Sequence, residues 1–243
     1  MRKIKASSSY LKNQARKNLA KASLCLIASG AIGVTMVHGL LFLSISVFST
    51  DGLLVFLLGL IPLAALLVGF NYYLRKYRIF SGGLQGEKQV ADLLKSSLND
   101  DYYLINNLYL KGGDGDIDHV VLAPSGIFVL ETKNWSGNIT CNGDEWRRDK
   151  NQIVGSSPSR QVKRNVAKIK AIIDNSPTLR GLGDCVEGVV VIINKHAILR
   201  LTNPTVPVLT LLQLPNYLKS QAEKRFSRRQ LELIGKELTK QKA

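Results

Sequence analysis

Cysteine is scarce in this chain, and none of it occurs in a metal or redox motif. The 243 residues include three cysteines, Cys25, Cys141 and Cys185, and no two of them form a CxxC pair. An odd number of isolated cysteines argues against a disulfide framework and against a zinc site built from thiolates. The sequence also has no internal repeat, which argues against a solenoid.

Charged residues are missing from two long segments near the N-terminus. Residues 22–48 and 52–74 contain no Asp, Glu, Lys or Arg. Each segment exceeds the roughly 20 residues that a helix needs to cross about 30 Å of hydrocarbon. A cleaved signal peptide is the alternative for the first segment, but a second apolar segment follows at once. We therefore expect a two-helix transmembrane hairpin over residues 22–74.

Acidic residues are absent from the first 21 residues, which carry seven lysines and arginines. Arg75, Lys76 and Arg78 follow the second apolar segment, whereas the short connection between the segments has only Asp51. The positive-inside rule then places both termini in the cytoplasm. We expect a multi-pass protein of the cytoplasmic (inner) cell membrane, with a basic cytoplasmic tail at 1–21 and a juxtamembrane linker at 75–82.

The rest of the chain has the pattern of a mixed α/β (α+β) domain, which we place at residues 83–215. Helical spacing of apolar residues predicts one helix from Gly86 and another from Pro158 to about Ile173. Apolar or alternating runs predict strands, with a turn at 111–115 and a hairpin at 138–148. The strands are expected at 102–110, 116–122, 127–133, 188–194 and 206–212. A basic helix is expected at 216–243.

Two acids and a lysine occupy a hairpin formed by two of these strands. Asp118 lies near the start of the first strand and Glu131 near the end of its partner, so a tight turn brings them side by side. Glu131 and Lys133 are two residues apart and share one face of the strand. Paired carboxylates with a nearby ammonium indicate a Mg²⁺ site that acts on a phosphate. The alternative, which the spacing alone favours because Glu-x-Lys is a common tripeptide, is a plain Glu–Lys ion pair with Asp118 capping a turn.

Three blocks of sequence resemble a known family. They are Gly86-Glu87, the run from Gly115 to Val120 (GDIDHV) and the run from Gly126 to Gly137 (GIFVLETKNWSG). Together they resemble the nuclease-related domain (NERD) family, which belongs to the PD-(D/E)xK, restriction-endonuclease-like superfamily. The resemblance covers roughly residues 83–174. It implies a restriction-endonuclease-like mixed β-sheet flanked by helices.

The resemblance also implies roles for individual residues. Glu87, Asp118 and Glu131 match the acidic metal ligands, and Lys133 matches the lysine of the Glu-x-Lys pair. Gln161 matches a glutamine thought to lie near the site, although this chain has Ser-Pro where the family usually has Asn-Pro. The Thr132 carbonyl would be a further ligand of Mg²⁺ or Mn²⁺. Asp116 is another candidate, since it shares the strand face of Asp118.

Three further side chains receive structural interpretations. In a regular strand His119 points to the face opposite Asp118, so we favour a structural hydrogen bond over catalysis. Trp135 and Trp146 are expected to pack near the second hairpin.

The expected function is that of a membrane-anchored, cytoplasm-facing, metal-dependent nuclease that hydrolyses phosphodiester bonds of nucleic acid, with DNA as the favoured substrate. The formal net charge of +15 is concentrated in the basic tails, which would contact DNA or anionic lipid. The alternative is a non-catalytic nucleic-acid-binding or scaffold protein that retains the nuclease-like fold at the membrane.

Overall fold

The computed structural model describes residues 1–4, 10–42, 49–110, 116–149, 152–221 and 223–240. The turn expected at 111–115 lies outside the described residues. The chain forms two compact units. One is Tyr10–Gly82, and the other combines Gly83–Ala243 with the N-terminal segment Met1–Ser9.

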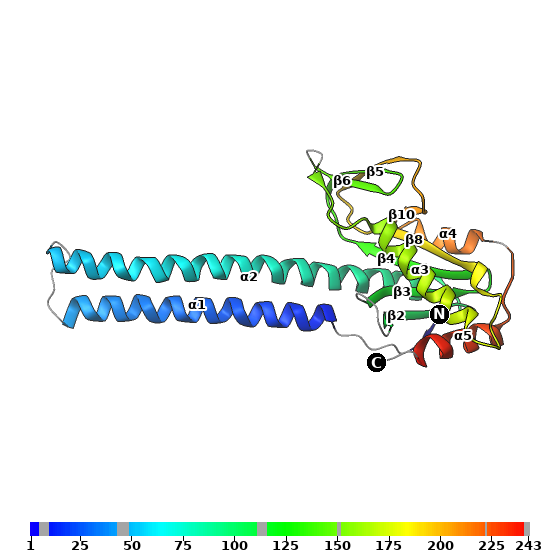
Figure 1. Ribbon diagram of the computed structural model, residues 1–243, viewed down its shortest axis with the longest axis horizontal. Coiled ribbons are helices and arrows are strands. Elements are labelled where there is room, and N and C mark those ends of the chain that lie inside the picture. The colour runs from blue at the N-terminus through cyan, green and yellow to red at the C-terminus, as the bar shows by residue number, and fades with distance from the viewer. Residues whose placement is uncertain (5–9, 43–48, 111–115, 150–151, 222, 241–243) are drawn as a thin grey trace. The chain divides into compact units, whose positions relative to one another are not determined.

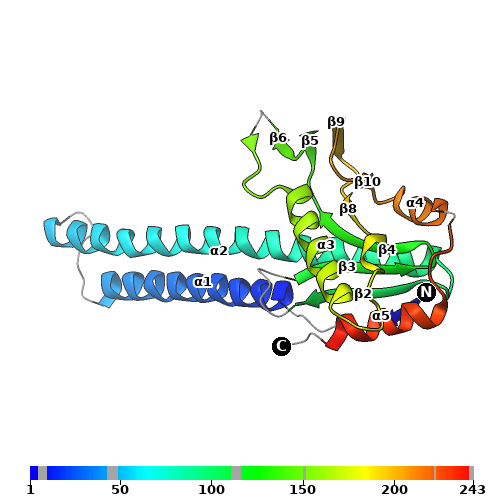
Figure 2. The same cartoon turned by 45° about the vertical axis from the view of Figure 1, so that its right-hand side comes forward.

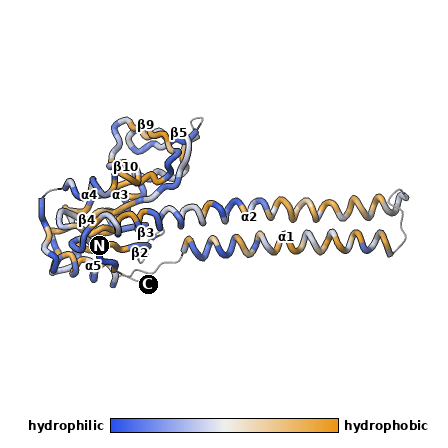
Figure 3. Tube along the Cα trace, turned by 180° about the vertical axis from the view of Figure 1, so that it is seen from behind, coloured by the Kyte–Doolittle hydropathy of each residue, from blue (hydrophilic) through white to orange (hydrophobic). Residues whose placement is uncertain are grey.

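The first unit consists of helix α1 (Tyr10–Phe42) and most of helix α2 (Thr50–Ser97). Hydrophobic residues follow one another along α1 and along the N-terminal part of α2 (Figure 3). Both helices are long and apolar enough to cross a membrane, judged by length and composition. Two apolar N-terminal helices are therefore present, as expected for a hairpin.

Helix α2 differs from the sequence prediction in its length. It continues without a break through residues 75–82, which were expected to be a linker, and includes Ser81, Gly82 and Gly83. A glycine inside a helix costs only about 1 kcal/mol relative to alanine, so two adjacent glycines need not end it. The helix predicted from Gly86 is thus the C-terminal part of α2.

The second unit is built on a mixed six-stranded sheet with the order β1-β2-β3-β4-β8-β10 (Figure 1). Strands β2, β3 and β4 are antiparallel neighbours, whereas β1 pairs with β2, β8 with β4 and β10 with β8 in parallel. The strands are β1 (Arg2–Ile4), β2 (Tyr103–Tyr109), β3 (Asp116–Ala123), β4 (Gly126–Lys133), β8 (Val186–Ile192) and β10 (Val208–Thr210). This arrangement agrees with the predicted mixed α/β fold.

Helices cover both faces of this sheet (Figure 2). Helices α3 (Pro158–Asp174) and α5 (Arg228–Lys240) bury apolar side chains against one face, among them Ile169 and Ile234. The C-terminal part of α2 and helix α4 (Leu214–Ser220) cover the other face, with Leu94 and Leu218 in the second core cluster. Covered on both faces, β8 is buried along nearly its whole length, as its continuous apolar sequence predicts.

A smaller four-stranded sheet has the order β7-β6-β5-β9. Strands β5 (Gly137–Asn142) and β6 (Glu145–Arg148) are the hairpin predicted at 138–148. Strands β7 (Gln152–Ile153) and β9 (Ala197–Thr202) were not expected. Trp146 is 2 % exposed, and its indole N–H donates to Ser159 Oγ at 2.8 Å, which confirms its packing role.

The two ends of the described chain also differ from the prediction. Residues 2–4 of the expected basic tail are strand β1, and the single helix expected at 216–243 is two helices, α4 and α5. Helix α5 buries Leu231 and Leu238 in the main core. The compact domain therefore extends past residue 215 and includes the C-terminal helix.

Candidate metal-dependent active site

Strands β3 and β4 place the first two acids next to each other. The antiparallel register pairs His119 with Leu130, so the next pair of residues along the ladder is Asp118 and Glu131. The backbone N–H of Thr132 donates to Asp118 Oδ2 at 2.7 Å. Asp118 is therefore fixed to the neighbouring strand and does not cap a turn, contrary to the alternative drawn from the sequence.

Lys133 is the last residue of β4 and lies close to Glu131. Its Nζ donates to Glu131 Oε1 at 2.5 Å and to Gln161 Oε1 of helix α3 at 3.3 Å. The Glu131 side chain is 2 % exposed and that of Lys133 is 21 % exposed. The carboxylate is thus buried, while the ammonium reaches the surface beside it.

Helix α2 contributes Glu87, which is buried at 8 % exposure. Asn107 Nδ2 of β2 donates to Glu87 Oε2 at 2.7 Å. Asn107 has a backbone φ of 50°, in the left-handed region that asparagine enters more readily than most residues. Asn107 is a site residue that sequence reasoning missed, because its role depends on a backbone conformation that no local pattern reveals.

The electrostatic environment disfavours charge on all three carboxyl groups. Burial and then the negative charge of Asp118 raise the pKa of Glu87 to about 8. Burial and then the charge of Glu131 raise the pKa of Asp118 well above its usual value. Burial also raises the pKa of Glu131, although Lys133 opposes that shift. The three acids, which come from α2, β3 and β4, therefore act on one another as like charges.

The donor set fits a hard divalent cation in its chemistry. Glu131 Oε2 is buried and has no hydrogen-bond partner among the described residues. This oxygen could serve as a ligand of a bound cation. Carboxylate oxygens are the ligands that Mg²⁺ and Mn²⁺ prefer. However, the described His, Cys, Asp and Glu side chains include no group of three placed to hold a metal. Coordination of one cation by all three carboxylates would therefore require them to move closer together.

The remaining predicted residues have clear positions. Asp116 begins β3, and its negative charge contributes to the raised pKa values of Glu87 and Asp118. The positive charge of Arg164 on α3 acts on Glu131 in the opposite sense and partly offsets the rise in its pKa. Gln161 lies next to Lys133, as described above. The Thr132 carbonyl stays a prediction as a ligand.

His119 has the structural role predicted for it. It is 1 % exposed, and its Nδ1 donates to Asn106 Oδ1 at 2.9 Å. Burial and then the charge of Lys95 lower its pKa to about 3. Trp135 packs edge-on against Trp146 with ring centroids 6.0 Å apart, which confirms its packing role.

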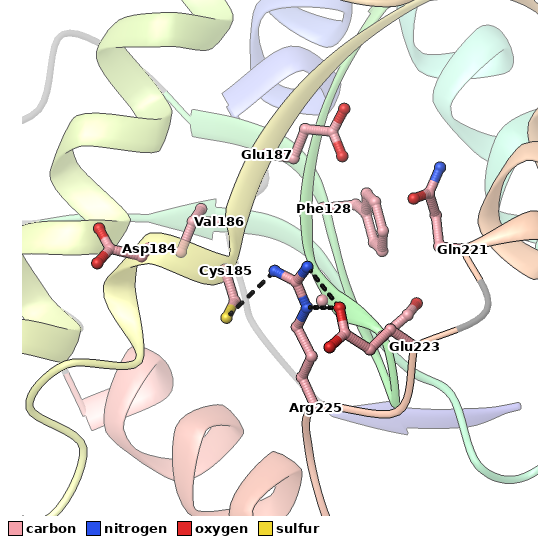
Figure 4. A pocket seen from close by; sticks show the side chains of 10 residues that line it. Phe128, Asp184, Cys185, Val186, Glu187, Gln221, Glu223 and Arg225 are labelled. Carbon is pink, nitrogen blue, oxygen red and sulfur yellow. Dashed lines mark hydrogen bonds and ion pairs between the residues drawn. The ribbon is translucent and has the colours of Figure 1, made fainter.

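A separate hollow of about 380 Å³ lies where β4 and β8 begin. Arg225 lies in it between Cys185 and Glu223 (Figure 4). Its guanidinium donates to Glu223 Oε2 at 2.8 and 3.1 Å, and Tyr217 donates to Glu187 Oε1 at 2.5 Å. Glu187 and Glu223 thus each accept hydrogen bonds from a nearby side chain.

Comparison with known proteins shows what this domain is similar to. Residues 82–193 match the family model of the nuclease-related domain (NERD). An uncharacterized protein of Bacillus anthracis is 39% identical over 78 residues, which are 31% of this chain and 37% of that protein. The chain thus spans little more than a third of the curated relative that it matches. No solved structure matches the chain significantly.

Proposed function

We propose that this protein is a metal-dependent nuclease that hydrolyses phosphodiester bonds of DNA, because residues 82–193 match the family model of the nuclease-related domain. The observation that carries the proposal is the buried Glu131, which has Lys133 on one oxygen and no hydrogen-bond partner for the other among the described residues. Glu87 and Asp118 add like charge to the same site. Such clusters of perturbed carboxyl groups are typical of catalytic sites.

Glu87, Asp118 and Glu131 would hold Mg²⁺ or Mn²⁺, with the Thr132 carbonyl as a further ligand and Asp116 nearby. When bound, the cation would lower the pKa of a water and neutralise charge that develops on the phosphate. Asn107 would keep the Glu87 carboxylate oriented through its 2.7 Å hydrogen bond.

Lys133 places a positive charge next to the three carboxyl groups of the candidate site. Its ammonium is held by Glu131 and Gln161, and its partial exposure lets it reach a substrate at the surface. Lys133 would orient the water that attacks phosphorus or would bind a phosphate oxygen. Arg164, on the same helix as Gln161, would add a contact to the nucleic-acid backbone.

The apolar helices would anchor this nuclease in the cell membrane with both termini in the cytoplasm. Lys76 Nζ lies 4.5 Å from the ring centroid of Tyr72, and Lys21 Nζ lies 5.4 Å from that of Tyr73. Aromatic residues next to basic ones, at the end of a charge-free segment, are typical of a cytoplasmic membrane interface. The basic tails would then lie close to anionic lipid.

The test is an assay of the full chain, purified in detergent, on supercoiled plasmid DNA with Mg²⁺ or Mn²⁺. We expect nicking by the wild type and its loss in Asp118→Asn, which removes a charge while retaining the oxygen that accepts from Thr132. The matched control is Asp149→Asn, because Asp149 also accepts a backbone N–H, from Asn138 at 2.8 Å, within the smaller sheet.

Two results would contradict the proposal. One is equal cleavage by wild type and Asp118→Asn, which would point to a contaminating nuclease. The other is a folded wild type that neither cleaves DNA nor binds Mn²⁺ in calorimetry, which would support the non-catalytic scaffold in place of the enzyme.

A further inference from the structure

An open cleft of about 680 Å³ lies beside the candidate active site. Helix α2, the segments after β4 and β8, and the end of β10 form its walls. Its volume falls within the range of about 300–1,000 Å³ that is usual for small-ligand sites. Neither the sequence analysis nor the family resemblance assigns a role to it.

The cleft begins within two residues of the catalytic candidates. Asn134, which lines it, directly follows Lys133, and Gln85 precedes Glu87 by two residues. The backbone N–H of Ile193 donates to the Lys133 carbonyl at 3.1 Å, which joins the end of β8 to the end of β4. A ligand in the cleft would therefore contact the chain segments that carry Lys133 and Glu87.

Neutral amide side chains dominate the polar lining. They are Gln85, Gln89, Asn134 and Asn194. Each primary amide presents a donor and an acceptor together, which is the pattern that hydrogen-bonds the edge of a nucleobase. None of the described residues that line the cleft is acidic, so a polyanion is not repelled.

Apolar and basic groups complete the lining. Leu212 is 80 % exposed, and Leu211 lies beside it. Exposed apolar surface of this kind suits the flat face of a base that has left its stack. His196 offers a ring for stacking, and the exposed Lys195 offers a charge for a phosphate.

Several of these side chains are already oriented. Asn194 Nδ2 donates to Asn134 Oδ1 at 3.0 Å, and the backbone N–H of His196 donates to Asn194 Oδ1 at 3.0 Å. Gln85 and Gln89 are one turn apart on α2, both exposed, and thus on the same helix face. Amides therefore line two sides of the cleft.

We propose that this cleft is a binding site for one unpaired nucleotide that adjoins the scissile phosphate. The proposal rests on the proposed nuclease function for the position of that phosphate. It predicts that the protein prefers single-stranded or frayed nucleic acid to a blunt duplex, since a paired base cannot enter the cleft.

The test measures binding separately from cleavage. Fluorescence anisotropy would follow the full chain in detergent, with Ca²⁺ replacing Mg²⁺, as it binds a labelled 12-nucleotide single strand of DNA, the same strand as RNA, or the blunt duplex. We expect the single strands to bind more tightly than the duplex. We expect Gln89→Ala combined with Leu212→Glu to weaken single-strand binding by about tenfold and to remove the preference.

Leu233→Glu is the matched control, because Leu233 is an exposed leucine of α5 outside the cleft. The proposal is overturned if the double variant binds single strands as the wild type does, or if the control weakens binding equally. Equal wild-type affinity for single strand and duplex would also overturn it. Loss of plasmid nicking in Asp118→Asn with no effect of the cleft variant would leave the nuclease function standing and remove only the cleft.

Discussion

The parallel pair of strands β4 and β8 has one acidic residue near each end, Glu187 where the strands begin and Glu131 where β4 ends, and the two acids have different surroundings. Where the strands begin, Glu187 accepts from Tyr217, and Glu223, from the chain after α4, accepts from Arg225. Where β4 ends, Glu131 is buried, and one of its oxygens has no hydrogen-bond partner among the described residues. A hollow lies at each end, of about 380 Å³ at the first and about 680 Å³ beside the second, so the presence of a hollow does not single out the site. The candidate active site is marked by the raised pKa values of its buried carboxyl groups, Glu87, Asp118 and Glu131.

The largest expected effect comes from removing the positive charge of Lys133, where β4 ends. Lys133→Met keeps most of the aliphatic stem and loses the ammonium that contacts Glu131 and Gln161. We expect plasmid nicking to fall by about 100-fold or more, as when other preorganised electrostatic contacts are lost. The measurement is the initial nicking rate with Mg²⁺. Lys236→Met, at an exposed position of α5, is the control, and equal rates for both variants would exclude Lys133 from the chemistry.

Much of this site could be predicted from the sequence, because two features are local. A two-residue period places Glu131 and Lys133 on one strand face, and a short turn brings Asp118 opposite Glu131. Glu87 could be assigned only through the family resemblance, because it lies on a helix that is distant in the sequence from the strands of Asp118 and Glu131. Asn107 could not be predicted, because its left-handed φ and its bond to Glu87 arise only in the folded sheet.

The second prediction concerns that asparagine. Asn107→Gly keeps a residue that accepts the φ of 50° but removes the amide, whereas Asn107→Asp keeps the shape and removes the donor. We expect both to slow nicking by about tenfold or more and to raise the Mg²⁺ concentration needed for half the maximal rate, as losses of ligand-orienting contacts do. Wild-type Mg²⁺ dependence in Asn107→Gly would show that only the backbone conformation matters.

The third prediction concerns His119, which is buried on β3 and directly follows Asp118 in the chain. Its folded-state pKa of about 3 is below the unfolded value of about 6.5, because protonation would add a proton to a buried Nε2 that has no partner among the described residues. His119 therefore contributes stability that is present above pH 6.5 and is lost as the pH falls towards 3. The slope is about 1.4 kcal/mol per pH unit.

The buried carboxyl groups have raised pKa values and give a slope of opposite sign, so the wild type alone cannot isolate this effect. Denaturant unfolding of wild type and His119→Gln should be compared at pH 5.5 and pH 4.5. We expect the free energy of unfolding of the wild type to fall by about 1 kcal/mol more than that of the variant. Parallel pH profiles would mean that His119 is already accessible to protons.

In the fold as well, the elements with a local sequence signal could be predicted, and those that depend on contacts between distant parts of the chain could not. The strands β2, β3, β4 and β8, the β5–β6 hairpin and helix α3 were predictable from periodicity and turn residues. Strand β1 has three residues, and its partners Tyr103–Ile105 lie a hundred residues away, so no local signal exists. The separation of α4 from α5 was missed because the basic, polar composition of this region is compatible with one continuous helix. The buried face of α5 is defined only by its packing against the sheet, which the local sequence does not reveal.

The smallest effect is expected where β4 and β8 begin, because Arg225→Ala there breaks an exposed ion pair. The Arg225 and Glu223 side chains are 48% and 76% exposed, and solvent screens such pairs so that they contribute little to stability. We expect a nicking rate within twofold of the wild type and a nearly unchanged free energy of unfolding. The same plasmid assay and denaturant titration measure both. A tenfold loss of nicking with unchanged stability would give the hollow a part in the reaction, because an exposed and already paired guanidinium can affect the rate only by contacting the substrate.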